Sequence, residues 1–252
     1  MSVPMAFLGD FGDAIDFILH ERDSVSGGVQ IGGLHELGGF AATHMYVSLA
    51  ALAIAALLAV PVALVLGHLG RGDFIATATS NVGRAVPSLA LLAFFISFVG
   101  LGYTNVIAVL VLLAIPPLIT NTYVGVRQVD RETVDAARGQ GMTGVEIVRK
   151  IELPLALPSI FGGLRTSAVN VVATATIAPL ADVRTLGEPI ITPQTYGLVG
   201  GLGAAIIVGI ITLLIDFAFA RLQRAVTPAG LKLAQPAPRR WFSLPTRRRL
   251  ES

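Results

Sequence analysis

One charged stretch carries most of the side chains that could act chemically. It is VDAARGQGMTGVEIVRKIELPLALP, residues 134–158, and its ionisable residues are Asp135, Arg138, Glu146, Arg149, Lys150 and Glu152. Ala136 and Ala137 allow a second surface to approach the backbone closely, and Gly141 allows a turn with positive φ. This combination suits docking into a groove of another protein. The alternative is an amphipathic loop that packs only on its own helix ends.

Local signals predict that a first short helix covers residues 131–138. Asp130 is a suitable N-cap for it, because a short carboxylate can accept hydrogen bonds from the free backbone N–H groups at a helix start. Gly139 and Gly141 are then expected to end the helix.

A second helix is predicted to start near Gly144. Thr143 and Glu146 have the T-x-x-E spacing of a capping box, in which each residue's side chain binds the other's backbone N–H. The helix should stop at Pro154, and its apolar stripe is formed by Ile147, Val148 and Ile151. The stretch should therefore form a helix, a tight turn and a helix.

Two further charged residues stand in otherwise apolar segments. Arg165 lies within residues 153–181, and Asp216 directly follows residues 197–215. A charge inside a membrane is unfavourable and usually faces protein or water. We therefore expect these two side chains to pair, within one chain or between two. The alternative is that Arg165 extends to the lipid headgroups.

Polar and helix-interrupting residues complete a candidate translocation pathway. A proline within a span frees backbone carbonyls that could face a cavity, although a packing kink is an equally simple explanation. Polar residues near the end of the third span could line the pathway or join helices by hydrogen bonds. The full candidate set is Pro87, Ser88, Asn121, Thr122, Arg165, Asn170 and Asp216.

The composition places these residues in a membrane protein. Of 252 residues, 54% are hydrophobic and 13% are charged, whereas soluble domains carry about 25% charged residues. The sequence has no cysteine, which excludes disulfides and cysteine-ligated metals. About 20 apolar residues span a bilayer, and five such spans are predicted, over 46–67, 74–99, 105–125, 153–181 and 197–215.

Lysine and arginine near the span ends predict the orientation. They are frequent in the charged stretch and after the fifth span, and Arg71 lies between the first two spans. With five spans, all three regions fall on the same side of the membrane. The charged stretch and the C-terminus are therefore expected in the cytoplasm, and the N-terminus outside.

The two ends of the chain are predicted to lie outside the transmembrane domain, which covers residues 44–227. Residues 1–43 are expected to form an amphipathic helix, at the interface or against the protein, and a glycine-rich linker. Residues 228–252 form a basic, proline-rich tail, which is expected to be disordered near anionic lipids. The positive-inside rule accounts for its charges, so nucleic acid is not an expected partner.

The spacing in the charged stretch resembles a family motif. Permease subunits of ATP-binding-cassette (ABC) importers carry the pattern E-A-A-x3-G-x9-I-x-L-P, and DAARGQG, nine residues and IELP follow it here. In that family this loop is a coupling helix that inserts into a groove of the cytoplasmic ATPase. The resemblance implies ATPase coupling by Asp135, in place of the usual glutamate, and by Ala136, Ala137, Gly141, Ile151, Leu153 and Pro154.

The resemblance also implies the fold and the partners. We expect an all-α polytopic membrane protein of the bacterial plasma membrane, with the methionine-importer-like fold of type I ABC importer permeases. Its partners would be cytoplasmic ATPases, an extracytoplasmic substrate-binding protein and a second permease, identical or related. The sequence has no G-x4-G-K-[ST] motif. This chain is therefore not expected to be an enzyme or to bind a cofactor or metal, and ATP with Mg would be used by the ATPase.

Longer segments resemble the permeases of osmoprotectant importers, which carry glycine betaine, choline, carnitine or proline betaine. They are VPSLALLAFF, PPLITNTYVGV, VDRETVDAARGQGMT and ELPLALPSIFGGLRTSAV. One place departs from that family. ADVRTLGEP stands where a GAGGLG-like turn is frequent, and only Leu186 and Gly187 match it.

Three alternatives remain open from the sequence. The first is an ABC importer permease for another small solute, such as methionine. The second is an ion-coupled secondary transporter, which would need paired acids at mid-membrane. The third is an intramembrane enzyme, which would need a nucleophile with a His or Asp partner; His44 and His68 are instead expected to mark the two interfaces of the first span.

Overall fold

The computed structural model describes residues 3–227, so the predicted tail over 228–252 lies outside the described residues. Its elements in chain order are α1 (Val3–Leu19), β1 (Glu21–Asp23), β2 (Gln30–Gly32), α2 (Gly33–Leu69), α3 (Asp73–Ala85), α4 (Ser88–Val99), α5 (Tyr103–Arg127), α6 (Arg131–Gly139), α7 (Gly144–Ile147), a π-helical turn (Val148–Glu152), α8 (Leu153–Thr174), a 3-10 helix (Ala175–Ala181), α9 (Glu188–Ile191) and α10 (Pro193–Val226).

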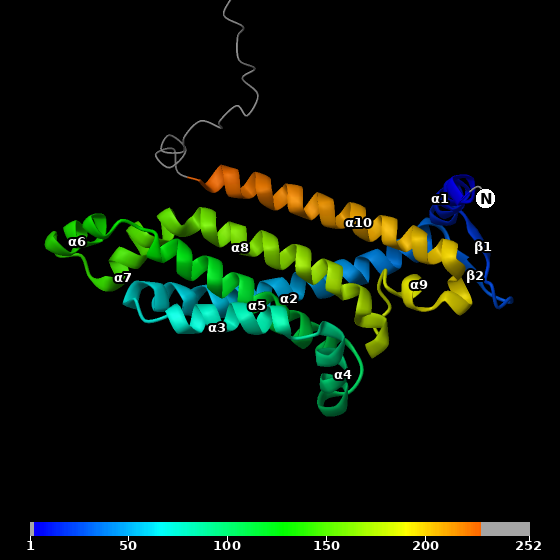
Figure 1. Ribbon diagram of the computed structural model, residues 1–252, viewed down its shortest axis with the longest axis horizontal. Coiled ribbons are helices and arrows are strands. Elements are labelled where there is room, and N and C mark those ends of the chain that lie inside the picture. The colour runs from blue at the N-terminus through cyan, green and yellow to red at the C-terminus, as the bar shows by residue number, and fades with distance from the viewer. Residues whose placement is uncertain (1–2, 228–252) are drawn as a thin grey trace, which may run out of the picture.

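The long helices lie side by side in one elongated bundle (Figure 1). α2, α3 and α8 pack against α5, and α10 packs against α8. On α2, the buried alanines Ala51, Ala55, Ala59 and Ala63 recur at every fourth residue. This spacing puts them on one face of the helix, and their small side chains allow α2 to pack closely against its neighbours.

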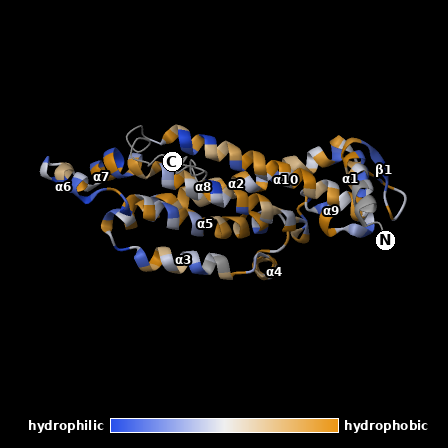
Figure 2. Cartoon of the chain, turned by 45° about the horizontal axis from the view of Figure 1, so that its top comes forward, coloured by the Kyte–Doolittle hydropathy of each residue, from blue (hydrophilic) through white to orange (hydrophobic). Residues whose placement is uncertain are grey.

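Within residues 3–227, four helical segments are long and apolar enough to cross a membrane. They are Gly33–Leu69, Tyr103–Arg127, Gly144–Ala181 and Pro193–Val226. Figure 2 shows hydrophobic residues along the whole length of these segments and a hydrophilic β1 at one end of the bundle. The predicted class, an α-helical polytopic membrane protein, is confirmed.

The predicted second span, over 74–99, is wrong as a single helix. It is divided into α3 and α4, and Pro87 between them has an extended backbone (φ −68°, ψ 121°). Proline has no N–H for the helical ladder and disfavours a helical conformation in the residue before it, and at Pro87 the helix is interrupted. α3 runs along the bundle, whereas α4 turns away from it (Figure 1).

The stretch predicted as a glycine-rich linker is structured instead. β1 and β2 form an antiparallel hairpin, and α2 already begins at Gly33 rather than at residue 46. The predicted first helix is present as α1, and it packs against α10 and α2. Phe17 of α1 is fully buried, and its ring meets that of Tyr196 edge-on, with 6.4 Å between centroids.

Tertiary contacts also change the place of His44. It was expected at the interface end of the first span, but its side chain is fully buried within the bundle. Its Nε2 lies 2.9 Å from the carbonyl oxygen of Val172 in α8. The reason is the early start of α2, which puts His44 well inside the helix.

Helix α8 approaches α5 closely at Gly163. A Cβ atom there would lie 2.9 Å from Cβ of Asn121 and 3.1 Å from the carbonyl oxygen of Pro117. We expect Gly163→Val to force the helices apart and to lower the free energy of unfolding by about 1–3 kcal/mol. The measurement is the thermal unfolding midpoint in detergent. Gly209→Val in α10 is the control, because nothing lies within 4 Å of a Cβ at that position; equal midpoints for the two variants would contradict the close packing.

Candidate coupling loop and translocation pathway

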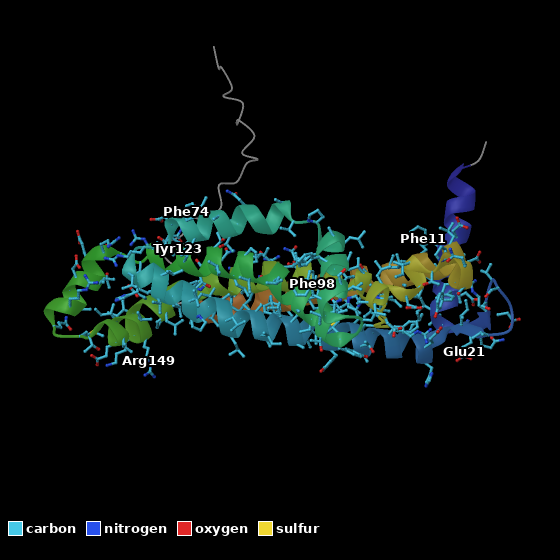
Figure 3. The ribbon with its side chains drawn as sticks, turned by 90° about the horizontal axis from the view of Figure 1, so that it is seen from below. Phe11, Glu21, Phe74, Phe98, Tyr123 and Arg149 are labelled. Carbon is cyan, nitrogen blue, oxygen red and sulfur yellow. The ribbon has the colours of Figure 1, made fainter. Side chains whose placement is uncertain are left out.

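The charged stretch forms one end of the bundle. α6 and α7 lie beyond the ends of α5 and α8, opposite the end that carries α1 and β1 (Figure 1). Figure 3 shows the same separation in the side chains, with Arg149 towards one end and Glu21 towards the other. We call Asp130 to Pro154 the coupling loop from here on.

The first helix of the coupling loop has the predicted cap. The carboxylate of Asp130 accepts a hydrogen bond of 3.0 Å from the backbone N–H of Glu132. The helix ends at Gly139, one residue later than predicted. The chain turns at Gly141, whose φ of +83° lies in the left-handed region, where a side chain would be strained.

The second helix has the predicted capping box, but it does not stop at Pro154. Thr143 N–H donates to the Glu146 carboxylate at 3.0 Å, and Glu146 N–H donates to the Thr143 hydroxyl at 3.4 Å. A π-helical turn, Val148–Glu152, then joins α7 to α8 without a break. In a regular α-helix the ring of Pro154 would meet the carbonyl four residues earlier, and the wider turn relieves this clash.

The coupling loop has a small hydrophobic core of its own. Buried Val129, Val134, Ala137 and Ile147 form this core, and Met142, Ile151 and Leu155 pack against it. Ala137 is only 4% exposed. It therefore stabilises the loop from inside and does not offer a second surface close access to the backbone, in contrast to the expectation.

The predicted coupling residues divide into two groups. Asp135, Ala136 and Gly141 are exposed on the outer face of the loop, and the Asp135 carboxylate lies 3.6 Å from the Arg138 guanidinium. The others lie behind this face: Ala137 and Ile151 pack in the loop core, and half-buried Leu153 and Pro154 begin α8. We call Asp135, Ala136 and Gly141 the outer face of the coupling loop.

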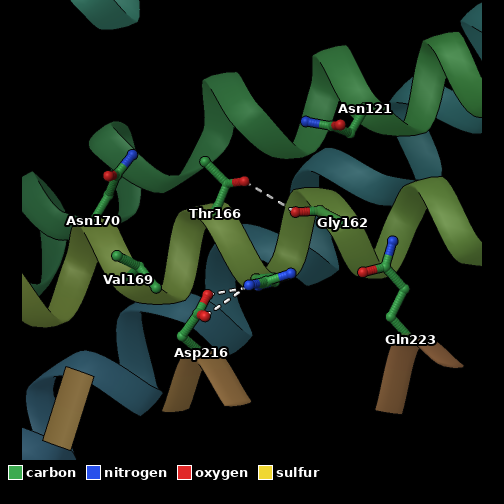
Figure 4. A pocket seen from close by; sticks show the side chains of 8 residues that line it. Asn121, Gly162, Thr166, Val169, Asn170, Asp216 and Gln223 are labelled. Atoms are coloured by element: carbon green, nitrogen blue, oxygen red, sulfur yellow. Dashed lines mark hydrogen bonds and ion pairs between the residues drawn. The ribbon is translucent and has the colours of Figure 1, made fainter. Parts of the chain in front are cut away.

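Arg165 and Asp216 form the expected ion pair, and they do so within one chain. The guanidinium binds the carboxylate through two hydrogen bonds, Nε to Oδ1 at 2.5 Å and Nη2 to Oδ2 at 2.7 Å. Such a bidentate arrangement is the strong form of this contact, and here it joins α8 to α10 (Figure 4). The two side chains remain 39% and 36% exposed, so the pair borders open space.

This ion pair lies in a groove of about 490 Å³. On α8 the lining residues recur at helical spacing, which explains why they share one face. The full lining consists of Asn121, Gly162, Arg165, Thr166, Val169, Asn170, Asp216 and Gln223 (Figure 4). The groove therefore brings together four of the predicted pathway residues, which are Asn121, Arg165, Asn170 and Asp216.

Three predicted pathway residues lie elsewhere. Pro87 and Ser88 stand at the junction of α3 and α4. Thr122 is fully buried, and its hydroxyl has no hydrogen-bond partner within the described part of the chain. Consecutive helical residues point about 100° apart, so Asn121 can face the groove while Thr122 faces the packed interior.

Gln223 lines the groove but was not expected there. The fifth span had been predicted to end at residue 215, whereas α10 continues to Val226. Asp216 and Gln223 are seven residues apart, which is about two helical turns, so they lie on the same face of the helix. This spacing was the sequence signal that could have identified Gln223 as a lining residue. Over residues 3–227, no cluster of three or more His, Asp or Glu side chains could hold a metal ion.

Sequence comparison finds close relatives over most of the chain. Residues 42–229 match the family described as binding-protein-dependent transport system inner membrane component. The chain is 36% identical over 190 residues to the glycine betaine/carnitine/choline transport system permease protein OpuCB of Bacillus subtilis, which covers 75% of this chain and 88% of that protein. It is 37% identical over 190 residues to the choline transport system permease protein OpuBB of the same organism, with the same coverage.

Structural comparison finds the same architecture in solved transporters. An inward-facing structure of the MetNI methionine ABC transporter matches with a TM-score of 0.66 at 24% identity, over 77% of this chain and 98% of that one. An amino acid ABC transporter crystallised with histidines matches with a TM-score of 0.56 at 17% identity, over 76% and 92%. These likenesses confirm the predicted fold of an ABC importer permease. With the sequence match, they show that this chain belongs to the family of binding-protein-dependent transport system inner membrane components.

Proposed function

We propose that this chain is the membrane-spanning permease subunit of an ATP-driven importer for osmoprotectants, such as glycine betaine, choline or related quaternary amines. The observation that carries this proposal is the 36–37% identity over 190 residues to permeases named for these solutes. In this role the permease catalyses no covalent reaction. ATP and Mg are used by a separate ATPase subunit, and the permease itself binds no cofactor.

The proposed assembly contains two permeases, identical or related, with two ATPases beneath them and a substrate-binding protein outside. The coupling loop faces the cytoplasm of a bacterial cell, and the end that carries α1 faces outwards. Support comes from the basic residues gathered at or beside the loop, because cytoplasmic segments are enriched in such residues. They are Arg127, Arg131, Arg138, Arg149 and Lys150.

The outer face of the coupling loop is the proposed docking surface for the ATPase. Asp135, Ala136 and Gly141 are exposed there, and the loop core holds them in place from behind. Asp135 keeps the negative charge of the family glutamate on a shorter side chain. Closure of the ATPases on ATP would draw the two loops together and turn the pathway outwards, and hydrolysis would return it inwards.

The groove between α5, α8 and α10 is proposed to form the part of the translocation pathway that this chain contributes. It contains an ion pair and two asparagines within otherwise apolar spans. Charged groups at membrane depth need protein or water around them rather than lipid. We leave Pro87, Ser88 and Thr122 out of this pathway, because they do not line the groove.

Uptake by the reconstituted complex tests the proposed substrate class. Vesicles that contain the permease, its ATPase and its binding protein should take up labelled glycine betaine or choline only with internal ATP. Excess unlabelled quaternary amine should compete, and methionine should not. ATP-driven uptake of methionine instead would favour the other importer function, and uptake driven by an ion gradient without ATP would favour a secondary transporter.

A substitution at Gly141 tests the docking surface. Gly141→Val should lower ATP-coupled uptake about tenfold or more, because a β-branched residue at φ +83° is strained by about 1–3 kcal/mol and would reshape the turn. Membrane insertion should be unchanged. Gly28→Val is the matched control: Gly28 is also exposed, with a φ of +80°, but it lies in the hairpin at the opposite end. Normal uptake by the Gly141 variant would exclude this docking surface.

A double-mutant cycle tests the ion pair in the groove. Arg165→Ala and Asp216→Ala should each reduce uptake, because each leaves an unpaired charge within the spans. The double variant should be less impaired than the product of the two single effects, with a coupling energy of about 0.5–3 kcal/mol. The charge-exchanged variant Arg165→Asp/Asp216→Arg should recover part of the activity. Independent effects in all these variants would show that the pair has no joint role in transport.

A further inference from the structure

One polar contact joins the coupling loop to a helix that is distant from it in sequence. His68 lies in the last turn of α2, and its Nδ1 is 2.8 Å from Oε2 of Glu152, the last residue of the π-helical turn. The two side chains are 16% and 6% exposed. Water therefore screens this contact little, and loss of either partner would leave the other polar group shielded and unpaired.

The imidazole of His68 is enclosed on its other edge as well. Its Nε2 lies 3.2 Å from the position that a Cβ atom on Gly144 would occupy, so the absence of a side chain at Gly144 makes room for the ring. A cavity of about 20 Å³ adjoins the contact, and Arg127, Arg131 and Arg138 are among its lining residues. Helices α2, α5 and α6 and the π-helical turn thus converge on one point.

Helix α2 differs from its neighbours in how it can follow the coupling loop. α5 leads directly into α6, and the π-helical turn leads directly into α8, so both are joined to the loop through the backbone. α2 is separated from the loop in sequence by α3, α4 and α5. Movement of the loop can therefore reach the end of α2 only through contacts in space, either directly or through helices packed against it.

The π-helical turn determines which side chains face α2 and which face the loop core. Ile151 packs towards the core of the coupling loop, whereas the next residue, Glu152, contacts His68 of α2. Two adjacent residues therefore connect the loop core and α2. The motif places Glu152 at the variable position of I-x-L-P, so the motif itself assigns it no role.

We propose that His68 and Glu152 are positioning residues for coupling, which tie the end of α2 to the coupling loop so that both move together. This inference rests on the proposed function, because it assigns the pair a part in ATP-coupled transport. When the ATPase displaces α6 and α7, the tie carries the displacement to α2. Without this contact, ATP is still hydrolysed, but less of the movement reaches α2.

The test compares solute uptake with ATP hydrolysis in the reconstituted complex. His68→Ala and Glu152→Ala should each leave the complex assembled and hydrolysing ATP, while solute moved per ATP falls about tenfold. The double variant should fall no further, because both substitutions remove the same tie. His68→Gln should recover part of the loss, since its amide can still donate a hydrogen bond to Glu152. His35→Ala, which alters an exposed histidine at the other end of α2, should behave as the unmodified protein.

The outcomes separate this inference from the proposed function. Normal solute uptake per ATP in the His68 and Glu152 variants, with uptake lost in Gly141→Val, would overturn the tie alone. Normal uptake in Gly141→Val would overturn the docking surface itself. Losses that simply multiply in the double variant would show that the two residues act separately, which also overturns the tie. If the alanine variants fail to assemble, His68→Gln and Glu152→Gln are measured instead. His68→Leu is then compared with His68→Gln, because only glutamine can still donate a hydrogen bond to Glu152. Equal uptake per ATP in these two His68 variants would contradict the inference.

Discussion

The close packing of α5 between α2 and α8 is the interaction on which the rest of the structure depends. Helices in lipid gain little from hydrophobic burial against each other, so their association relies on close contact and on polar links between them. Gly163 and the alanine face of α2 provide the close contact. The bond from Ser167 Oγ to the carbonyl oxygen of Ala114, at 2.8 Å, adds a polar link between α8 and α5.

Helix α8 connects the two candidate functional regions. Its first turn follows the π-helical turn of the coupling loop, and further along the same helix Arg165 and Asn170 line the groove. α8 runs as one helix from Leu153 to Thr174, with Pro158 inside it. In the proposed function, displacement of the coupling loop would move α8 and so shift Arg165 relative to its partner Asp216 on α10.

Local signals predicted part of the loop correctly and failed where packing intervened. The cap at Asp130 and the capping box of Thr143 and Glu146 depend on residues within one turn, so sequence spacing was sufficient to find them. Pro154 was expected to end a helix, but a π-helical turn joins α7 to α8 there without a break, and α8 packs against α5. Pro87 had the opposite outcome: the helix ended there, and the segment predicted as one span became α3 and α4.

The sequence by itself determined the membrane class, the coupling motif and the residues able to form an ion pair, because these follow from composition and from spacing along one helix. The tertiary structure decided which of those residues meet. It placed Asn121 in the groove and Thr122 in the packed interior, and it extended α10 so that Gln223 reaches the groove. It also brought His68 to Glu152 across 84 positions of the chain. Such contacts depend on the rotation and crossing of packed helices, which no periodicity within a single segment specifies.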